Sequence, residues 1–453
     1  MVDVANLPIE VLNEILSLLP SREDSSRLSP TFFGDLYNVS LCSRRLHNII
    51  EARIYSRIEL SSSRSVALIT RTFLERPQLA FLVLEATIDA YDGQDRTLGS
   101  DKLMASFSTD SLHTAVRATG LPTYETQSWV VEFRDGRSDA RAALMVSMFP
   151  NLMTLSVIIS THDRPLRYLK LLAHHASHIG PASRSISSPS TNQEKQSVPQ
   201  NTFATLKEVR IDSTSSLDYD ETLPIMNLPS LRTLYTYGLF TSRWNWEPPP
   251  DSSGLWHLQL DGCDMNSDEL FCMLRSCRAL RTFEYVWDQH CWCDENYSND
   301  EEDDEDDACG SGLDLGPIVM EGLSSSKSSL TSLKVDGFGV VRNDIRSFGS
   351  LVEFRNLQQI WAPSIFVLNA SEERYKHHLT DMLPAALESL HLNINGLPRE
   401  ETLIAELVEL VKSETHLILR QIILDHRARY RVHLGDAVDV TPLEAACATA
   451  GIT

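Results

Sequence analysis

The chain has 453 residues, 42% of them hydrophobic, and its 40 basic and 62 acidic side chains give a formal charge of −22. This acidic balance argues against a protein whose main task is to bind nucleic-acid phosphates. No stretch approaches the roughly 18 uninterrupted apolar residues of a membrane span, and Asp3 and Glu10 stand where a signal peptide would be basic and then apolar. We therefore expect a cytoplasmic or nuclear protein with neither nucleic acid nor membrane as partner. Its eight cysteines are too few for a disulfide scaffold, and we expect most of them to be small buried hydrophobes.

Residues 7–20, LPIEVLNEILSLLP, predict a first helix with more apolar surface than one contact can bury. One face carries Leu12 and Leu16, and the adjacent face carries Val11 and Ile15. Together they cover nearly twice the stripe of about 100° that a surface helix needs. Two more short helices are expected, around 35–39 and 46–50. Something outside these three helices is needed to bury the second face of the first.

A phrase of the form apolar-x-x-apolar-x-apolar recurs along the rest of the chain, and it suits a short strand with one buried face. It starts at Leu152, Leu206, Leu231, Leu255, Leu280, Leu330, Leu357, Leu387 and Leu419. Most starts are about 25 residues apart and two intervals are about double, within the range of leucine-rich repeats, which run about 20 to 29 residues. The segment 267–277 fits the helical return of such a repeat. The alternative is that the phrase recurs by chance in a Leu-rich chain, but chance hits would not keep a near-constant interval.

The two long intervals are expected to contain insertions, and each end of the array is expected to carry an additional element. Residues 181–200 are rich in Ser and Pro, and residues 294–307 hold ten acidic residues and no base, so disordered insertions are expected near 181–200 and 294–312. Residues 56–88 predict an irregular strand-helix-strand first repeat. Thr441 is expected to open a last helix with a capping box to Glu444. The acidic run could attract a basic partner or be a solvated loop.

The N-terminal residues resemble a known motif. LPIEVLNEILSLLP followed by DLYNVSLCSRRLHNII (35–50) resembles the F-box, and the continuation looks like fungal F-box proteins with degenerate leucine-rich repeats. The residues 21–34 between the first two helices are a departure, because the family usually has only a few residues there. The resemblance implies that the surplus apolar face binds a Skp-type adaptor and, through it, a cullin. The adaptor contacts that it implies are Leu7, Pro8, Val11, Ile15, Leu36 and Leu46.

No catalytic motif is present in the sequence: there is no G-x-S-x-G, Gly-rich phosphate loop or H-E-x-x-H. His290, Cys291, Cys293 and Cys309 raise the possibility of a zinc site, but one residue between the paired cysteines is fewer than structural sites use. His174 and His178 lie one helical turn apart without an evident third ligand. We expect no enzyme, no cofactor and no metal.

These observations predict an α/β chain with a three-helix F-box over 1–55 and an irregular leucine-rich-repeat solenoid over 56–453. The predicted function is substrate recognition in a cullin-RING (SCF-type) ubiquitin ligase. The alternative is a repeat-based interaction scaffold that is no ligase and whose N-terminal helices only cap the solenoid. A target protein would meet the concave side of the array, where the residue before the final apolar position of each phrase points away from the core. These candidates are Arg210, Tyr235, Gln259, Glu284, Lys334, Trp361 and His391; equally, they could be ordinary solvated strand residues.

Overall fold

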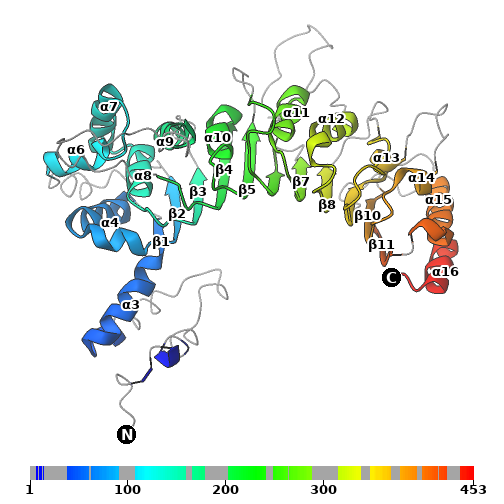
Figure 1. Cartoon of the computed structure of the whole chain (residues 1–453), viewed down its shortest axis with the longest axis horizontal. Helices are drawn as coiled ribbons and strands as arrows, with labels where there is room; N and C mark the ends of the chain where they lie inside the picture. Colours follow the sequence, from blue (N-terminus) through cyan, green and yellow to red (C-terminus); the bar gives the residue numbers. More distant parts are fainter. Residues whose placement is uncertain are drawn as a thin grey trace, which may run out of the picture. The chain divides into compact units, whose positions relative to one another are not determined.

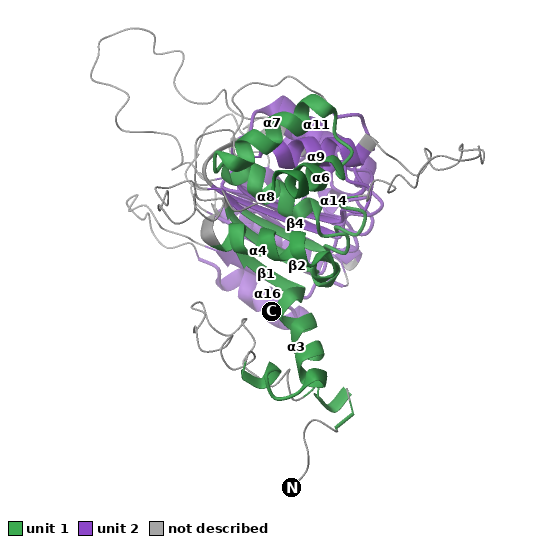
Figure 2. Ribbon diagram, turned by 90° about the vertical axis from the view of Figure 1, so that its left-hand side faces the viewer, with its two compact units in different colours: residues 1–157, 186–206 green, residues 158–185, 207–453 purple. Residues whose placement is uncertain are grey.

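A computed structural model of the chain forms two compact units (Figure 2). Unit 1 comprises residues 1–157 and 186–206, and unit 2 comprises residues 158–185 and 207–453. The structure describes residues 7–8, 10–12, 14, 38–60, 63–90, 108–159, 166–178, 202–240, 248–263, 265–287, 315–337, 347–368, 378–394, 400–416, 418–425 and 439–453. The segment 21–34 and the insertions expected near 181–200 and 294–312 lie outside these residues.

Unit 1 contains the expected strand-helix-strand repeat. Its elements are α3 (Arg44–Ser56), β1 (Arg57–Leu60), α4 (Ser63–Glu75), the 3-10 helix η3 (Pro77–Leu82) and β2 (Glu85–Ala90). Strands β1 and β2 pair in parallel, with Ile58 opposite Ala86 and Leu60 opposite Ile88. Ile58 and Leu60 are buried because alternate residues of a strand share one face, and the residues between them are exposed. The prediction for residues 56–88 is confirmed.

Among the residues that the structure describes between β2 and β3 (Thr154–Ile159), unit 1 has three helices that we did not predict from the sequence. They are α6 (Thr109–Arg117), α7 (Thr123–Arg134) and α8 (Ser138–Ser147). The fully buried Trp129 of α7 joins two of them, because its indole Nε1 donates a hydrogen bond of 2.7 Å to the carbonyl oxygen of Ala140. A buried indole needs such a partner, so this bond fixes how α7 meets α8.

Unit 2 repeats one strand and one return, as the phrase predicts (Figure 1). After α9 (Arg167–His178), its strands are β4 (Glu208–Asp218), β5 (Thr233–Phe240), β6 (His257–Asp261), β7 (Thr282–Trp287), β8 (Ser332–Gly337), β9 (Gln359–Pro363), β10 (Ser389–Asn393) and β11 (Gln421–Asp425). Its further helices are α10 (Tyr219–Met226), α11 (Ser267–Ser276), α12 (Leu315–Gly322), η6 (Leu323–Ser326), α13 (Ser364–Val367), α14 (Leu379–Met382), α15 (Glu400–Lys412), η7 (Glu414–His416) and α16 (Thr441–Ala450). The strands of the chain follow one another in sequence order, and each pair from β4 to β11 is parallel. Every predicted phrase leads into a strand.

The core of unit 2 lies between the strands and the helices, which Figure 1 shows on one side of β4 to β8. The apolar positions of the phrase fill this core; in the β6 repeat, Leu255, Leu258 and Leu260 are all fully buried. Helix α11 begins with a capping box, because the Asn266 side chain accepts from the Glu269 backbone N–H and the Glu269 carboxylate accepts from the Asn266 N–H. The expected helical return at 267–277 is confirmed.

The start of α16 differs from the prediction. Thr441 is not the N-cap residue, because it is the first residue of the helix and Val440 precedes it without a side-chain cap. Instead, the Asp439 carboxylate accepts the Thr441 backbone N–H at 3.0 Å. A carboxylate is favoured beside the positive end of a helix, and here it lies two residues before Thr441. The helix is confirmed, and its capping box is wrong.

Three described cysteines are core residues, as the composition predicts. Cys263, Cys272 and Cys277 are buried free thiols. Burial raises the pKa of Cys263 and of Cys277 to about 12, because the apolar surroundings disfavour a thiolate. Cys42 is exposed and Cys447 is partly exposed.

Gly238 in β5 should tolerate no larger side chain. Its φ of +72° is unfavourable for other residues, and a Cβ would overlap the carbonyl oxygen of Ser213 on the neighbouring strand. Gly349 has a φ of +70° but nothing within 4 Å of an added Cβ. We expect Gly349→Ala to cost about 1 to 2 kcal/mol of backbone strain, and Gly238→Ala to cost about 1 to 3 kcal/mol more from the overlap. Chemical denaturation of both variants measures the difference, and equal costs would contradict the role of Ser213.

Candidate functional site

The residues predicted to bind a target form a single row across unit 2. Each is the register partner of the next, so β4 to β10 bring together residues up to 181 positions apart in sequence (391 − 210). The row, which we call the central row, runs through Arg210, Tyr235, Gln259, Glu284, Lys334, Trp361 and His391. Arg210 is exposed, and the other six are partly exposed. Ile423 of β11 continues the row beyond His391.

Side chains of the central row interact with their neighbours. The Arg210 guanidinium lies 4.9 Å from the centroid of the Tyr235 ring. Lys334 Nζ lies 3.3 Å from a Glu284 carboxylate oxygen and 4.7 Å from the centroid of the Trp361 ring. Cation–π contacts of this kind orient charged groups over aromatic faces. The row therefore contains two groups of contacting side chains, Arg210 with Tyr235 and Glu284 with Lys334 and Trp361.

The two ends of the row differ. At one end Trp361 stacks on His391, with ring centroids 3.8 Å apart and planes inclined by 24°. His391 Nε2 also lies 3.8 Å from an Asp425 carboxylate oxygen. At the other end Tyr235 contacts His257, with centroids 5.0 Å apart. Rigid aromatic groups that are partly exposed and flanked by charges are suited to protein recognition.

Burial on this face shifts the pKa values of three groups. Burial raises the pKa of Tyr235, and Glu208 adds to the increase whereas Arg210 opposes it. Burial lowers the pKa of His257, and the nearby carboxylates of Glu284 and Glu208 oppose that decrease. Burial also raises the pKa of Asp212, whereas Arg210 lowers it. In each case desolvation is the largest cause, so the face is partly shielded from water.

Three aspartates lie beside the central row, toward the carboxyl ends of the strands; two are partly exposed and Asp336 is buried. Asp212, Asp261 and Asp336 occupy the equivalent position of β4, β6 and β8, joined through register partners on β5 and β7. We call this the aspartate row. The sequence analysis gave it no role, although its position, directly after the last apolar residue of the phrase, could have revealed it.

A second overlooked row lies at the amino ends of the strands. Its first four residues are Lys207, Arg232, Trp256 and Arg281, each directly after the first leucine of its phrase. We call this the edge row. The shared position of these residues could be seen by comparing the phrases. It lies just outside each strand, however, and the alternation of a strand does not predict where a side chain outside it points.

The residues expected to contact an adaptor are only partly described. Pro8 is exposed, Val11 is 39% exposed, and Leu7 packs against a small cluster of Leu12, Leu46 and Ile50. Leu46 is 5% exposed within that cluster, so its side chain is not presented to a partner in this conformation. Ile15 and Leu36 lie outside the described residues.

In the part of the chain that the structure describes, no group of three or more His, Cys, Asp and Glu side chains is arranged to hold a metal ion. His290, Cys291, Cys293 and Cys309 lie outside that part. No described helix is long and apolar enough to cross a bilayer.

We expect the stability of the protein to fall as the pH decreases below the ordinary histidine pKa of 6.5, in part because of His257. The folded state lowers the pKa of this imidazole, so the unfolded chain binds the proton first, and the stabilisation present above 6.5 is lost at lower pH. Denaturation across this pH range should show that the free energy of unfolding of the His257→Gln variant depends less steeply on pH than that of the wild type. A dependence as steep as that of the wild type would contradict this role.

The comparisons with known proteins agree with this geometry. The family described as leucine-rich repeat domain matches residues 57–437, which is most of the chain. No curated protein was found to match. The matched region begins at the first residue of β1 and includes every residue of the central, aspartate and edge rows. Leucine-rich repeats are an architecture for binding other proteins, and their strands line the binding surface. The chain belongs to the leucine-rich repeat domain family, and it has a protein-interaction role.

Proposed function

We propose that this protein is the substrate-recognition subunit of a cullin-RING (SCF-type) ubiquitin ligase. Its N-terminal helices, within residues 1–55, bind a Skp-type adaptor that links the protein to a cullin, and its repeats bind a target protein. The protein performs no chemistry itself. It raises the effective concentration of target lysines near a ubiquitin-loaded enzyme held elsewhere in the assembly.

The observation that carries the proposal is the asymmetric burial of the N-terminal helices. Leu12, Leu46 and Ile50 form a cluster that buries one face of the first helical segment. Val11, the residue next to Leu12, is 39% exposed, and Leu41 is 66% exposed. Apolar side chains mark a protein-binding surface where they form a contiguous exposed patch, and in the proposed function Val11 and Leu41 belong to such a patch. This supports an adaptor interface that includes Leu7, Pro8 and Val11, with Leu46 stabilising the helices behind it.

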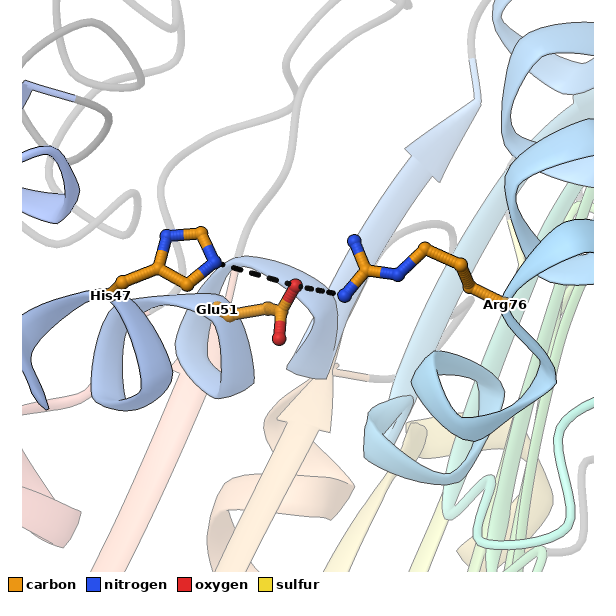
Figure 3. Close-up of polar contacts among 3 residues, drawn as sticks. All are labelled: His47, Glu51 and Arg76. Atoms are coloured by element: carbon orange, nitrogen blue, oxygen red, sulfur yellow. Dashed lines mark hydrogen bonds and ion pairs between the residues drawn. The ribbon is translucent and has the colours of Figure 1, made fainter. Parts of the chain in front are cut away.

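One observation favours the alternative, a scaffold whose N-terminal helices are only a cap. The Glu51 carboxylate of α3 accepts a hydrogen bond of 2.7 Å from Arg76 Nη2, and His47 Nε2 lies 3.8 Å from the same oxygen (Figure 3). The Leu84 backbone N–H also donates to the Ser56 carbonyl oxygen at 2.9 Å. These contacts join α3 to the first repeat, as a terminal cap would be joined. A subunit that must hold adaptor and target in a fixed relation needs the same connection, so the adaptor assay decides between the two.

We expect the full-length protein to capture a purified Skp-type adaptor in a stoichiometric complex. Val11→Asp should weaken capture by at least about tenfold, because a charge would be buried at the apolar interface. Changing Leu7 and Pro8 together to Ala should also weaken it. Val131→Asp is a matched control, because Val131 on α7 is 57% exposed and lies outside the proposed interface.

Calorimetry or quantitative pull-down measures these affinities, with another F-box protein as the positive control. If the wild-type protein fails under conditions in which that control succeeds, the scaffold function replaces the ligase function. Equal losses in the Val11 and Val131 variants would also contradict the interface.

A second prediction concerns the central row as the target-binding surface. The double variant Tyr235→Ala/Trp361→Ala should lose a subset of the proteins labelled by proximity labelling in cells, because it removes the two large aromatic groups of the row. Tyr124→Ala on α7 is the control, since Tyr124 is 69% exposed and belongs to unit 1, whereas the central row belongs to unit 2. The variants are compared at matched expression and thermal stability. An unchanged set of labelled proteins would exclude the central row.

A further inference from the structure

The edge row is a continuous line of residues along the amino ends of β4 to β7. The Arg232 N–H donates to the Lys207 carbonyl oxygen at 2.8 Å, and the Trp256 N–H donates to that of Arg232 at 2.8 Å. The Arg281 N–H then donates to the Trp256 carbonyl oxygen at 2.7 Å. Because neighbouring strands lie about 4.8 Å apart, these four residues span about 15 Å. Three of the four carry a positive charge.

Two of the three cations of this row, Arg232 and Arg281, lie around one aromatic ring. Trp256 is 44% exposed, and the guanidinium carbons of Arg232 and Arg281 lie 5.4 Å and 4.5 Å from the centroid of its ring. Arg232 Nη1 also donates to the carbonyl oxygens of Leu231 and Gly254 at 2.7 Å and 3.3 Å. Such contacts already restrict the rotamers of these arginines, so less side-chain entropy is lost when a ligand binds.

These cations lack acidic partners within the described residues. None of Lys207, Arg232 and Arg281 forms an ion pair there, whereas Lys334 pairs with Glu284 and Lys327 pairs with Glu353. No described side-chain hydrogen bond uses the guanidinium of Arg281, so its donors are available. In a chain with a formal charge of −22, a row of three uncompensated cations is a local reversal of charge. Charge complementarity therefore selects an anionic ligand.

We propose that the edge row binds an extended acidic segment of a partner protein. Arginine forks match carboxylates in bidentate geometry, and the exposed Trp256 ring offers an apolar surface for the backbone or for proline. Arg232 and Arg281 are two strands apart, about 10 Å. This matches the rise of about 9 Å over three residues of a polyproline II segment. The expected ligand therefore has acidic residues at every third position. The inference is independent of the adaptor, because it concerns only unit 2.

The test uses the full-length protein and a fluorescent peptide of Glu-Pro-Ser repeats, followed by anisotropy at low ionic strength. We expect saturable binding that weakens with added salt and is lost when Gln replaces Glu in the peptide. The variant Lys207→Gln/Arg281→Gln should bind about tenfold more weakly, as expected from losing two charged contacts. Arg117→Gln on α6 is the control for removal of an exposed charge, and it should bind like the wild type.

Thermal unfolding accompanies each measurement, and Lys207→Gln alone keeps the test valid if the double variant unfolds, because Lys207 is exposed. A phosphoserine-Pro-Ser peptide distinguishes phosphates from carboxylates as the source of charge; binding of either through the edge row supports the site. The proposal is overturned if neither peptide binds, or if the edge variants bind as the wild type does. Tighter binding of single-stranded nucleic acid or of phosphatidylserine vesicles than of both peptides would also overturn it. Adaptor capture is measured on the same variants and should be unchanged.

Discussion

The parallel register between neighbouring strands is the constraint on which every surface of unit 2 depends. Leu234 pairs with Leu258, which pairs with Phe283, and all three are buried. Because side chains alternate along a strand, this pairing places Tyr235, Gln259 and Glu284 in line on the opposite face. A displacement of one residue in any strand would move its apolar set out of the core. Each buried leucine would then lose about 1.5 to 3 kcal/mol. The core therefore fixes which side chains meet at the surface.

The same register places charged residues of different sign at different positions along the strands. Cations stand at the amino ends in the edge row, both signs stand in the central row, and aspartates stand toward the carboxyl ends. Lys207 and Asp212 mark the two limits in β4. Their five-residue separation corresponds to about 16 Å at the rise of a strand. This exceeds the Debye length of about 8 Å at physiological ionic strength, so the aspartates do little to neutralise the edge row.

The N-terminal helices obey a different constraint, which is the size of their core. The cluster around Leu12 and Ile50 is small, and so few residues cannot bury a large apolar area alone. The Glu51–Arg76 hydrogen bond and the edge-to-face contact of Tyr55 with the buried Phe73 connect α3 to the first repeat. Among the described residues, this cluster covers one side of the first helical segment and leaves Val11 39% exposed. In the proposed function, an adaptor covers this exposed side of the first helical segment.

Local spacing in the sequence was enough to predict the repeats, the strands β1 to β11 and the residues that make up the central row. Each of these depends on the spacing of nearby residues. The apolar positions of the phrase that starts at Leu255, for example, predict which residues of β6 face the core. Only the tertiary structure revealed that Trp256 lies between Arg232 and Arg281, that Leu46 is buried, and that Asp439 rather than Thr441 supplies the carboxylate at the start of α16. The helices α6 to α8 also appeared only there. Contacts of this kind join residues outside the strand pattern, and the positions of such residues depend on packing that no local period encodes.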